Sequence, residues 1–272
     1  NVKDYLKQCI RSIYNSDIDN NSFEIIVIDN DSHDGTIQDI KSNFPKVITK
    51  QNNFNLGFSK AVNCGLELSR GDYLCILNPD IIVSENTFST LLKYTSEHQN
   101  IGCIGPKILD SDGGFQQSCK RSFPTPISAF FKFFGLDRIF PNSRFFGKYN
   151  LTYLDNNKIH SINAISGAFM LFPRKIIFEV GFFDERFFMF AEDLDYCYQI
   201  KTKGYDIIYN PNTEIIHYKG ESVKHAPYNM VNIFYSAMQI YFDKYATNHK
   251  YWKFLSIFVR VALKIHKSAS YF

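Results

Sequence analysis

The first hundred residues alternate between short apolar runs and segments whose apolar residues recur at helical spacing. Residues 24–29 (EIIVID) and 73–77 (YLCIL) have the continuous apolar pattern of strands buried on both faces of a parallel sheet. Residues 2–14 form an amphipathic helix, with Leu6, Cys9 and Ile13 on one face. This alternation predicts an α/β fold with a doubly wound, Rossmann-like, mostly parallel central sheet flanked by helices.

The same patterns extend these predictions along the chain. Further strands are expected at residues 47–49, 101–104, 206–209 and 213–218, and within residues 161–172, interrupted at Ser166-Gly167. Helices are expected from residue 36 and at residues 58–69, 86–98, 174–180 and 192–203. Residues 122–150 are rich in phenylalanine and have no clear period, so no regular element is assigned there.

Composition excludes several classes of protein. The 272 residues are 45% hydrophobic, and a net charge of +3 is too small to indicate a nucleic-acid partner. The six cysteines contain no C-x-x-C pair, which favours free thiols in a reducing compartment and therefore the cytoplasm. No secretory signal is present, and no apolar run reaches the roughly 18 residues that a spanning helix needs.

Polar clusters follow two of the expected strands, where ligands gather in doubly wound sheets. Asp29, Asn30 and Asp34 follow the first strand, and their side chains suit hydrogen bonds to a base or a ribose. The alternative is ordinary turn and capping chemistry before the next helix. Gly57 precedes another helix and would let a phosphate approach the backbone, or it serves a simple glycine turn.

The segment Asn78-Pro79-Asp80 interrupts a strand-like run, because proline donates no ladder hydrogen bond. Asp80 offers a charged oxygen and Asn78 a neutral one, which suits Mg²⁺ or Mn²⁺ bound to a nucleoside diphosphate. A turn aspartate is the alternative. His217, at the end of an expected strand, is a further candidate ligand, although a single histidine also suits a structural role.

Adjacent acids, Glu192 and Asp193, begin a predicted helix directly after the apolar run Phe187–Phe190 (FFMF). A carboxylate in a dry pocket has a raised pKa, which suits a general base. The alternative is that both acids simply stabilise the helix N-terminus.

Taken in order, six motifs resemble glycosyltransferase family 2, and within it the rhamnosyltransferase-like branch. These motifs are IDNDSHDGT, NFNLGFSKAVNCGL, YLCILNPDIIV, AISGAFMLF, VGFFDERFFMFAEDLDYCYQI and IIHYKGES. The resemblance covers about residues 1–222 and implies a GT-A fold. Its donor half would occupy about residues 1–113 and its acceptor half about 114–222, with residues 223–272 as a helical C-terminal appendage.

The resemblance also implies roles for the candidate residues. Asp29 and Asp34 match the acids that hold the donor's base and ribose, and Asp80 matches the last acid of the metal-binding D-x-D motif. Its first position is Asn78 here, which leaves one charge fewer on the Mg²⁺ or Mn²⁺ ion. Asp193 matches the catalytic base of an inverting transfer. Glu192 would support it near the acceptor, and His217 matches a histidine near the metal.

Family members begin with an apolar strand before the segment that matches residues 2–14, and this strand is absent here. We therefore expect the chain to be a fragment that lacks about ten residues, the length of one strand and its approach.

The last residues suggest a membrane surface. On a helix, Lys253, Ser256, Arg260, Lys264 and Lys267 form one basic stripe beside a broad apolar surface that includes Trp252. Residues 250–267 are thus expected to contact an anionic membrane, such as the inner face of the plasma membrane, unless they form a terminal helix packed on its own domain.

The sequence predicts an inverting glycosyltransferase that moves one sugar, with rhamnose suggested by the branch, from a nucleoside-diphosphate sugar to a glycan or lipid-linked acceptor in bacterial surface polysaccharide synthesis. A nucleotidyltransferase would carry a glycine-rich basic loop near its start, and a non-catalytic sugar-binding module would lack acids such as Asp80 and Asp193. A processive polymerase would carry spanning helices and a Q-x-x-R-W motif. The sequence has no such glycine-rich loop, spanning helix or Q-x-x-R-W motif, and it does have Asp80 and Asp193.

Overall fold

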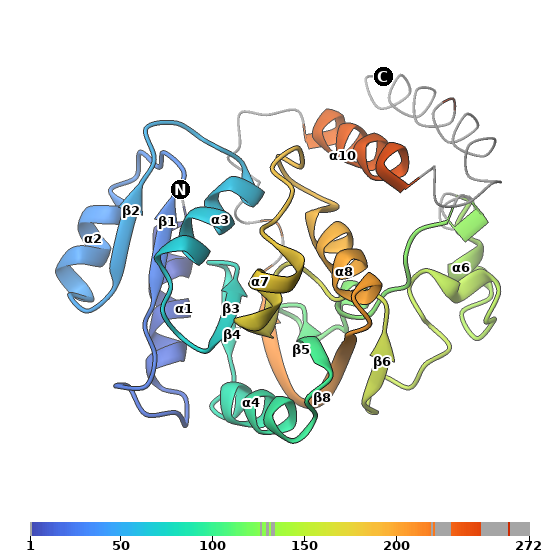
Figure 1. Ribbon diagram of the computed structural model, residues 1–272, viewed down its shortest axis with the longest axis horizontal. Helices are drawn as coiled ribbons and strands as arrows, with labels where there is room; N and C mark the ends of the chain where they lie inside the picture. Colours follow the sequence, from blue (N-terminus) through green and yellow to red (C-terminus); the bar gives the residue numbers. More distant parts are fainter. Residues whose placement is uncertain are drawn as a thin grey trace.

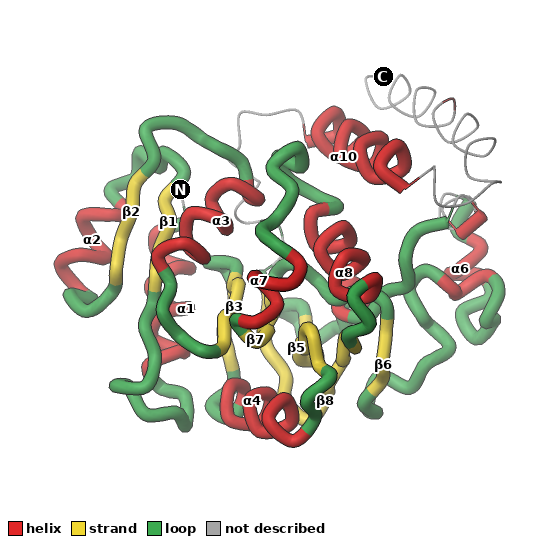
Figure 2. The backbone as a smooth tube through the Cα atoms, in the orientation of Figure 1, coloured by secondary structure: helices red, strands yellow, loops and turns green. Residues whose placement is uncertain are grey.

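The structure is a computed structural model that describes residues 2–125, 127–128, 131, 134–218, 220, 230–245 and 261. Helices and strands alternate through the first half of the chain, as Figures 1 and 2 show, and the expected α/β fold is confirmed. The helices are α1 (Lys3–Tyr14), α2 (Thr36–Asn43), α3 (Phe58–Leu68), α4 (Thr87–Glu97), α6 (Leu136–Ile139), α7 (Lys175–Val180), α8 (Glu192–Thr202) and α10 (Met230–Tyr245), with short 3₁₀ turns η1 (Gln117–Cys119) and η2 (Phe146–Lys148).

A small two-stranded sheet lies at one end of the molecule (Figure 1). It pairs β1 (Ile26–Asp29) in parallel with β2 (Ile48–Gln51). The apolar residues of β1 are only partly buried, whereas the sequence predicted a strand covered on both faces. The reason is that β1 pairs only with β2 among the described strands, so it forms an edge of its sheet.

The main sheet has the strand order β3-β7-β5-β8-β4, with β6 also paired to β8. Its strands are β3 (Tyr73–Leu77), β4 (Ile81–Val83), β5 (Ile101–Leu109), β6 (His160–Ile162), β7 (Phe169–Pro173) and β8 (Asp206–His217). The sheet is mixed: β5 and β8 run parallel, whereas β7 is antiparallel to both β3 and β5. Parallel pairing is thus found between β1 and β2 and between β5 and β8.

One expected strand break is wrong. The sequence predicted two strands at residues 206–209 and 213–218, which left Asn210-Pro211-Asn212 between them. The structure has one continuous strand, β8, whose register against β5 jumps from the Pro106–Asn210 pair to the Lys107–Glu214 pair. Residues 211–213 form a bulge in β8 that has no partners in β5, and the strand continues beyond it to His217.

Helices α4 and α8 pack on β5 and β8, and α10 joins the same core. Ala237, Tyr241, Phe242 and Tyr245 of α10 are all buried. The ammonium of Lys244 lies 2.7 Å from Asp195 Oδ1, and the Tyr245 hydroxyl donates a 2.6 Å hydrogen bond to the same carboxylate. The predicted helical content of residues 223–272 is therefore confirmed for residues 230–245.

The basic stripe predicted at residues 250–267 lies outside the described residues, apart from Val261. Within the described part of the chain, none of the helices combines the length and apolar character needed to cross a bilayer.

Candidate active site

Asp80 and His217 lie side by side although 136 residues separate them in the chain. The antiparallel pairing of β4 with β8 places Ile81 opposite His217, which brings the residue before β4 against the end of β8. His217 Nε2 lies 3.4 Å from Asp80 Oδ1, and the backbone N–H of Tyr218 donates to the carbonyl of Asp80 at 2.9 Å. Asp80 is 2% exposed, so this carboxylate has been removed from bulk water.

Gln116 fixes how the imidazole of His217 is oriented. Its side-chain nitrogen donates to Asp110 Oδ1 at 2.7 Å and to the backbone carbonyl of His217 at 3.0 Å, so its oxygen must be the acceptor. That oxygen lies 3.0 Å from His217 Nδ1. Nδ1 therefore carries a hydrogen, and Nε2 is the ring nitrogen that faces Asp80.

These residues fit a divalent cation bound together with a substrate diphosphate. One carboxylate and one imidazole nitrogen of fixed tautomer converge from Asp80 and His217. Among the described residues, no group of three or more acidic, histidine or cysteine side chains is arranged to hold a metal. Mg²⁺ commonly uses one or two protein ligands and takes the rest from phosphate oxygens and water, so a two-ligand site is sufficient.

Glu192 and Asp193 begin α8 after an unusual stretch of backbone. Phe190 and Ala191 both have left-handed φ values, +69° and +62°, which non-glycine residues rarely adopt. Each such residue costs of order 1–3 kcal/mol and is held only where surrounding contacts require it. The turn places both acids in the interior, with 7% and 9% of their surfaces exposed.

Asp193 forms an ion pair that sequence reasoning missed. The guanidinium of Arg121 donates a 2.6 Å hydrogen bond to Asp193 Oδ2, which also accepts the N–H of Gly167 at 2.8 Å. Gly167 allows this approach, because an added Cβ would stand only 3.2 Å from the Asp193 Cβ. Arg121 lies just before residues 122–150, outside every element that the sequence predicted, and no local pattern distinguishes it from any other arginine. The guanidinium thus gives the Asp193 carboxylate a buried counter-charge.

Glu192 has a different environment from its neighbour. Burial, reinforced by the adjacent Asp193 carboxylate, raises the pKa of Glu192 to about 8. Its Oε2 atom is buried and has no hydrogen-bond partner among the described residues. The pair thus joins one carboxylate that is bound to a buried guanidinium to one that holds its proton near neutral pH, an arrangement typical of acid–base sites.

The raised pKa of Glu192 predicts a pH-dependent stability. The unfolded state loses this proton above about pH 4.5, whereas the folded state keeps it to about pH 8. Protonated Glu192 therefore favours the folded state fully below pH 4.5. This contribution to the free energy of unfolding is lost as pH rises through 8. Relative to the parent, Glu192→Gln should gain free energy of unfolding between pH 5 and 8, by up to about 5 kcal/mol. Urea unfolding across this range measures it, and a difference independent of pH would contradict the assignment.

The two acidic sites meet at the beginning of β7. The backbone N–H of Asn78 donates to the carbonyl of Ala168 at 2.9 Å, while the preceding residue, Gly167, donates to Asp193. The corner that carries Asp80 and the turn that carries Asp193 are therefore attached to consecutive residues of one segment. The sequence predicted that these acids serve one site, and this shared attachment supports it.

The first polar cluster is held by its own hydrogen bonds. Asp29 is buried, and its carboxylate accepts the N–H of Ser32 at 3.1 Å. Asp34 accepts the N–H of Thr36 at 3.1 Å. Burial alone would raise the pKa of Asp34, but the hydrogen bonds from Thr36 outweigh it and hold that pKa below its usual value. Both acids thus make the turn-type hydrogen bonds that the sequence left as the alternative, although neither caps α2, and their donor-binding roles stay predictions.

Asn30 and Gly57 connect this cluster to the segment before α8. The Asn30 side chain donates to the Gly57 carbonyl at 3.0 Å. The N–H of Phe58 donates to the Phe188 carbonyl at 2.6 Å. A Cβ on Gly57, which has φ +84°, would lie 2.6 Å from atoms of Phe188. Gly57 therefore allows close contact with the protein's own backbone, and its predicted contact with phosphate stays untested.

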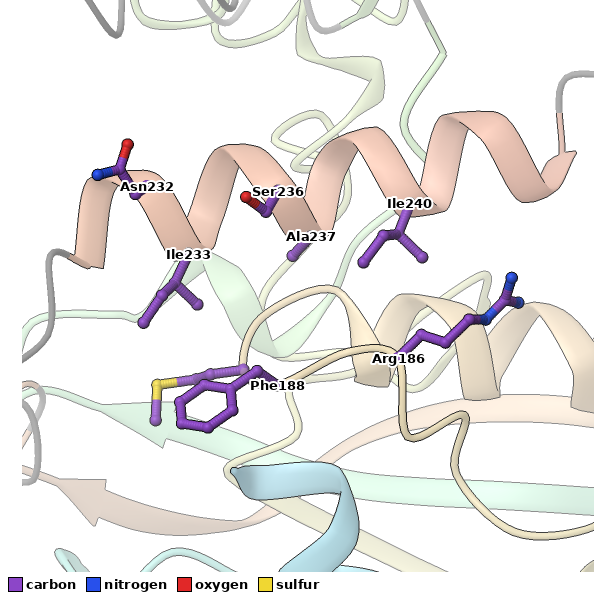
Figure 3. A pocket seen from close by; sticks show the side chains of 8 residues that line it. Arg186, Phe188, Asn232, Ile233, Ser236, Ala237 and Ile240 are labelled. Atoms are coloured by element: carbon purple, nitrogen blue, oxygen red, sulfur yellow. The ribbon is translucent and has the colours of Figure 1, made fainter. Parts of the chain in front are cut away.

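A cavity of about 170 Å³ lies between α10 and the segment that precedes the acid pair (Figure 3). Phe188, which contacts Gly57, forms part of its floor, and Ile233 and Ile240 line it from α10 (Figure 3). The remaining lining residues are Arg186, Met189, Asn232, Ser236 and Ala237. Most of these side chains are apolar, so the cavity suits an apolar group beside the site.

Curated relatives resemble the chain over most of its length. It is 27% identical over 243 residues to the N-acetylglucosaminyl-diphospho-decaprenol L-rhamnosyltransferase of Mycobacterium tuberculosis, covering 84% of this chain and 76% of the relative. It is 28% identical over 150 residues to the rhamnosyltransferase WbbL of Escherichia coli, covering 54% and 52%.

Solved structures and a family model complete the comparison. S. aureus TarS residues 1–349 match with a TM-score of 0.59 and 16% identity, over 92% of this chain and 64% of that one. A mannosyltransferase of Pyrobaculum calidifontis in complex with GDP-Man and Mn²⁺ matches with a TM-score of 0.59 and 17% identity, over 93% and 64%. These likenesses confirm the GT-A fold. The model of glycosyl transferase family 2 matches residues 1–180. The chain belongs to glycosyl transferase family 2, as its six motifs indicated.

Proposed function

We propose that the protein transfers one sugar from a nucleoside-diphosphate donor to a hydroxyl of a lipid-linked glycan, in the synthesis of a bacterial surface polysaccharide. The observation that carries the proposal is the attachment of the Asp80 corner and of Asp193 to consecutive residues, Ala168 and Gly167. A base and a cation site held by one segment can act on opposite sides of one glycosidic bond.

The donor would bind along the ends of β1 and β3. We assign Asp29, Asn30 and Asp34 to the base and ribose, and Gly57 and Asn78 to the neighbouring part of the donor. Asp80 and His217 would hold Mg²⁺ or Mn²⁺, which neutralises negative charge on the departing diphosphate. The complex of the Pyrobaculum protein with GDP-Man and Mn²⁺ supports a nucleotide sugar and a divalent ion in this fold.

Asp193 would act as the base of an inverting displacement. It takes the proton of the acceptor hydroxyl, the hydroxyl oxygen attacks the anomeric carbon, and the bond from that carbon to the diphosphate oxygen breaks. Arg121 and the Gly167 N–H both bind Asp193 Oδ2, and the backbone N–H of Leu194 donates to Oδ1 at 2.7 Å, so these contacts orient the carboxylate. The second lone pair of Oδ1 would take the acceptor proton. Glu192 would contact the acceptor beside it.

The acceptor class is proposed from the relatives and the cavity. The Mycobacterium tuberculosis relative is named for a decaprenol-linked acceptor and for transfer of rhamnose. The apolar cavity beside Phe188 and α10 supports an acceptor with an apolar portion near the acid pair. Rhamnose is accordingly the first donor sugar to test, with a uridine-diphosphate hexose as the second.

A donor screen tests the proposed function. Purified protein is incubated with candidate nucleotide sugars and a short-chain polyprenyl-diphosphate-linked sugar, with and without Mn²⁺ or Mg²⁺. We expect release of nucleoside diphosphate together with an acceptor heavier by one sugar, at a rate increased by the cation. Binding of nucleotide sugars without any transfer would favour the non-catalytic alternative. Release of pyrophosphate from a nucleoside triphosphate and a sugar phosphate would favour the nucleotidyltransferase.

A further inference from the structure

The segment around α6 and η2 carries large apolar side chains with about half or more of their surface exposed. Ile139 is 64% exposed, Phe145 61% and Phe140 49%. An isolated exposed apolar residue is normal, but three within seven positions of one compact hairpin form a patch, and such patches mark interaction sites. The Phe134 side chain, next to α6, is also more than half exposed.

These rings belong to an ordered aromatic cluster. The ring centroid of the half-buried Phe146 lies 5.2 Å from that of Phe140 and 5.3 Å from that of Phe145. Phe131 contacts Phe145 and Phe146 from the preceding segment, at 4.8 and 4.9 Å. Ring contacts at these distances are favourable, so the exposed rings are held in place.

The same surface carries only positive charge. Arg138, Arg144 and Lys148 are exposed between the apolar side chains. Asp137, the single acid in residues 134–150, is buried and accepts a 3.1 Å hydrogen bond from the Asn150 side chain. We name these six exposed residues the α6–η2 surface: Arg138, Ile139, Phe140, Arg144, Phe145 and Lys148.

We propose that the α6–η2 surface binds an anionic lipid bilayer. Aromatic and aliphatic side chains enter the headgroup boundary, while arginine and lysine pair with lipid phosphates, so their mixture on one exposed surface is complementary to such a membrane. The surface is separate from the tail at residues 250–267. It also lies at the opposite end of the molecule's longest axis from α2 and the β1–β2 sheet (Figure 1).

This location suits the proposed reaction, on which the choice of a lipid partner partly rests. Asp29 and Asp34 lie at the far end with β1 and α2, so a nucleotide bound there would remain on the side away from the lipid. A decaprenol-linked acceptor of the kind named for the Mycobacterium tuberculosis relative is embedded in a bilayer by its chain. Binding through the α6–η2 surface would bring the acceptor half of the domain to that bilayer.

Vesicle binding tests the proposal without any donor or acceptor, so its result does not depend on transfer. The full chain is titrated with vesicles of phosphatidylglycerol and phosphatidylcholine, and with phosphatidylcholine alone. We expect binding to the anionic vesicles only. Arg138→Gln with Lys148→Gln should weaken it roughly thirty-fold, since each charge near the surface contributes about 1 kcal/mol. Phe140→Ser with Phe145→Ser should weaken it further and remove part of its resistance to salt.

Matched controls use equally exposed residues elsewhere. Phe178→Ser on α7, where the ring is 79% exposed, and Lys41→Gln with Lys46→Gln near α2 should leave vesicle binding unchanged. Circular dichroism and thermal unfolding confirm that each variant is folded. Equal loss in the controls, equal binding to neutral vesicles, or unchanged binding in both α6–η2 variants would overturn the proposal. A dimer of the parent that the Phe140→Ser, Phe145→Ser variant loses would assign the surface to a second copy of the chain instead.

Discussion

Replacing Asp193 by Asn is expected to lower the turnover of sugar transfer by about 10²–10⁴-fold while donor affinity is retained. An asparagine keeps the shape of the side chain and one acceptor oxygen for the Gly167 N–H, but it has no basic oxygen that can take the acceptor proton. It also removes the negative partner of the buried Arg121, so some loss of stability is expected beside the loss of the chemical step. Thermal unfolding of the variant shows whether it remains folded at the assay temperature.

Single-turnover rates and donor binding by calorimetry separate these two effects. Asp72→Asn is the matched control, because this exposed carboxyl at the start of β3 lies at the other end of the strand from the site. The control should have parental rates. An Asp193→Asn variant with undiminished turnover would remove Asp193 from the role of base and direct attention to Glu192, which would then have to lose its proton above pH 8.

Replacing Asp80 by Ala is expected to abolish the response to Mn²⁺ or Mg²⁺ and to reduce turnover by about 10²–10³-fold. A bound cation stabilises the departing diphosphate by several kcal/mol, and His217 alone cannot hold it. Turnover is measured against cation concentration at saturating donor, with Asp72→Ala as the control. A variant that is still activated by the cation at the parental concentration would show that Asp80 is not its ligand.

Gln116→Leu is expected to weaken cation binding without abolishing it. It removes the acceptor that keeps the hydrogen on His217 Nδ1, and loss of such a supporting partner typically weakens metal binding 10–100-fold. The cation concentration for half-maximal turnover should rise accordingly, while turnover at saturating cation changes little. Gln99→Leu, at an exposed position after α4, should change neither quantity.

The elements of the fold were predictable where a local pattern determines them. The strand at residues 73–77 and the helices that begin at residues 36, 58 and 192 follow from apolar period and capping residues, and the structure has them at the same starts. Strand pairing was harder to predict, because periodicity does not identify the partner strand. The insertion of β7 between β3 and β5 pairs Tyr73 with Pro173 and Ile104 with Leu171, which are far apart in the chain.

The candidate site residues also fall into those that a local motif indicates and those that only tertiary contacts reveal. Asp80, Asp193 and His217 were proposed as site residues because each ends a strand or begins a helix within a distinctive motif. Arg121 and Gln116 were missed, because both lie between the expected strands at residues 101–104 and 161–172, where the sequence predicted no regular element, and both act only through tertiary contacts. Their partners, Asp193 and His217, lie 72 and 101 residues away. A buried carboxylate and a buried imidazole do, however, require partners, so the need for such residues follows from the sequence even though their identity does not.

The contact between Lys244 and Asp195 affects how the enzyme should be truncated for study. The six motifs end near residue 222, which invites an expression boundary there. Such a cut would delete the cation and the hydroxyl that satisfy a carboxylate only 1% exposed, three residues from the start of α8, and would open one wall of the cavity beside Phe188. A shortened protein that lacks α10 would therefore be a poor surrogate in inhibitor screens, because its inactivity would report a damaged interior and not a missing substrate.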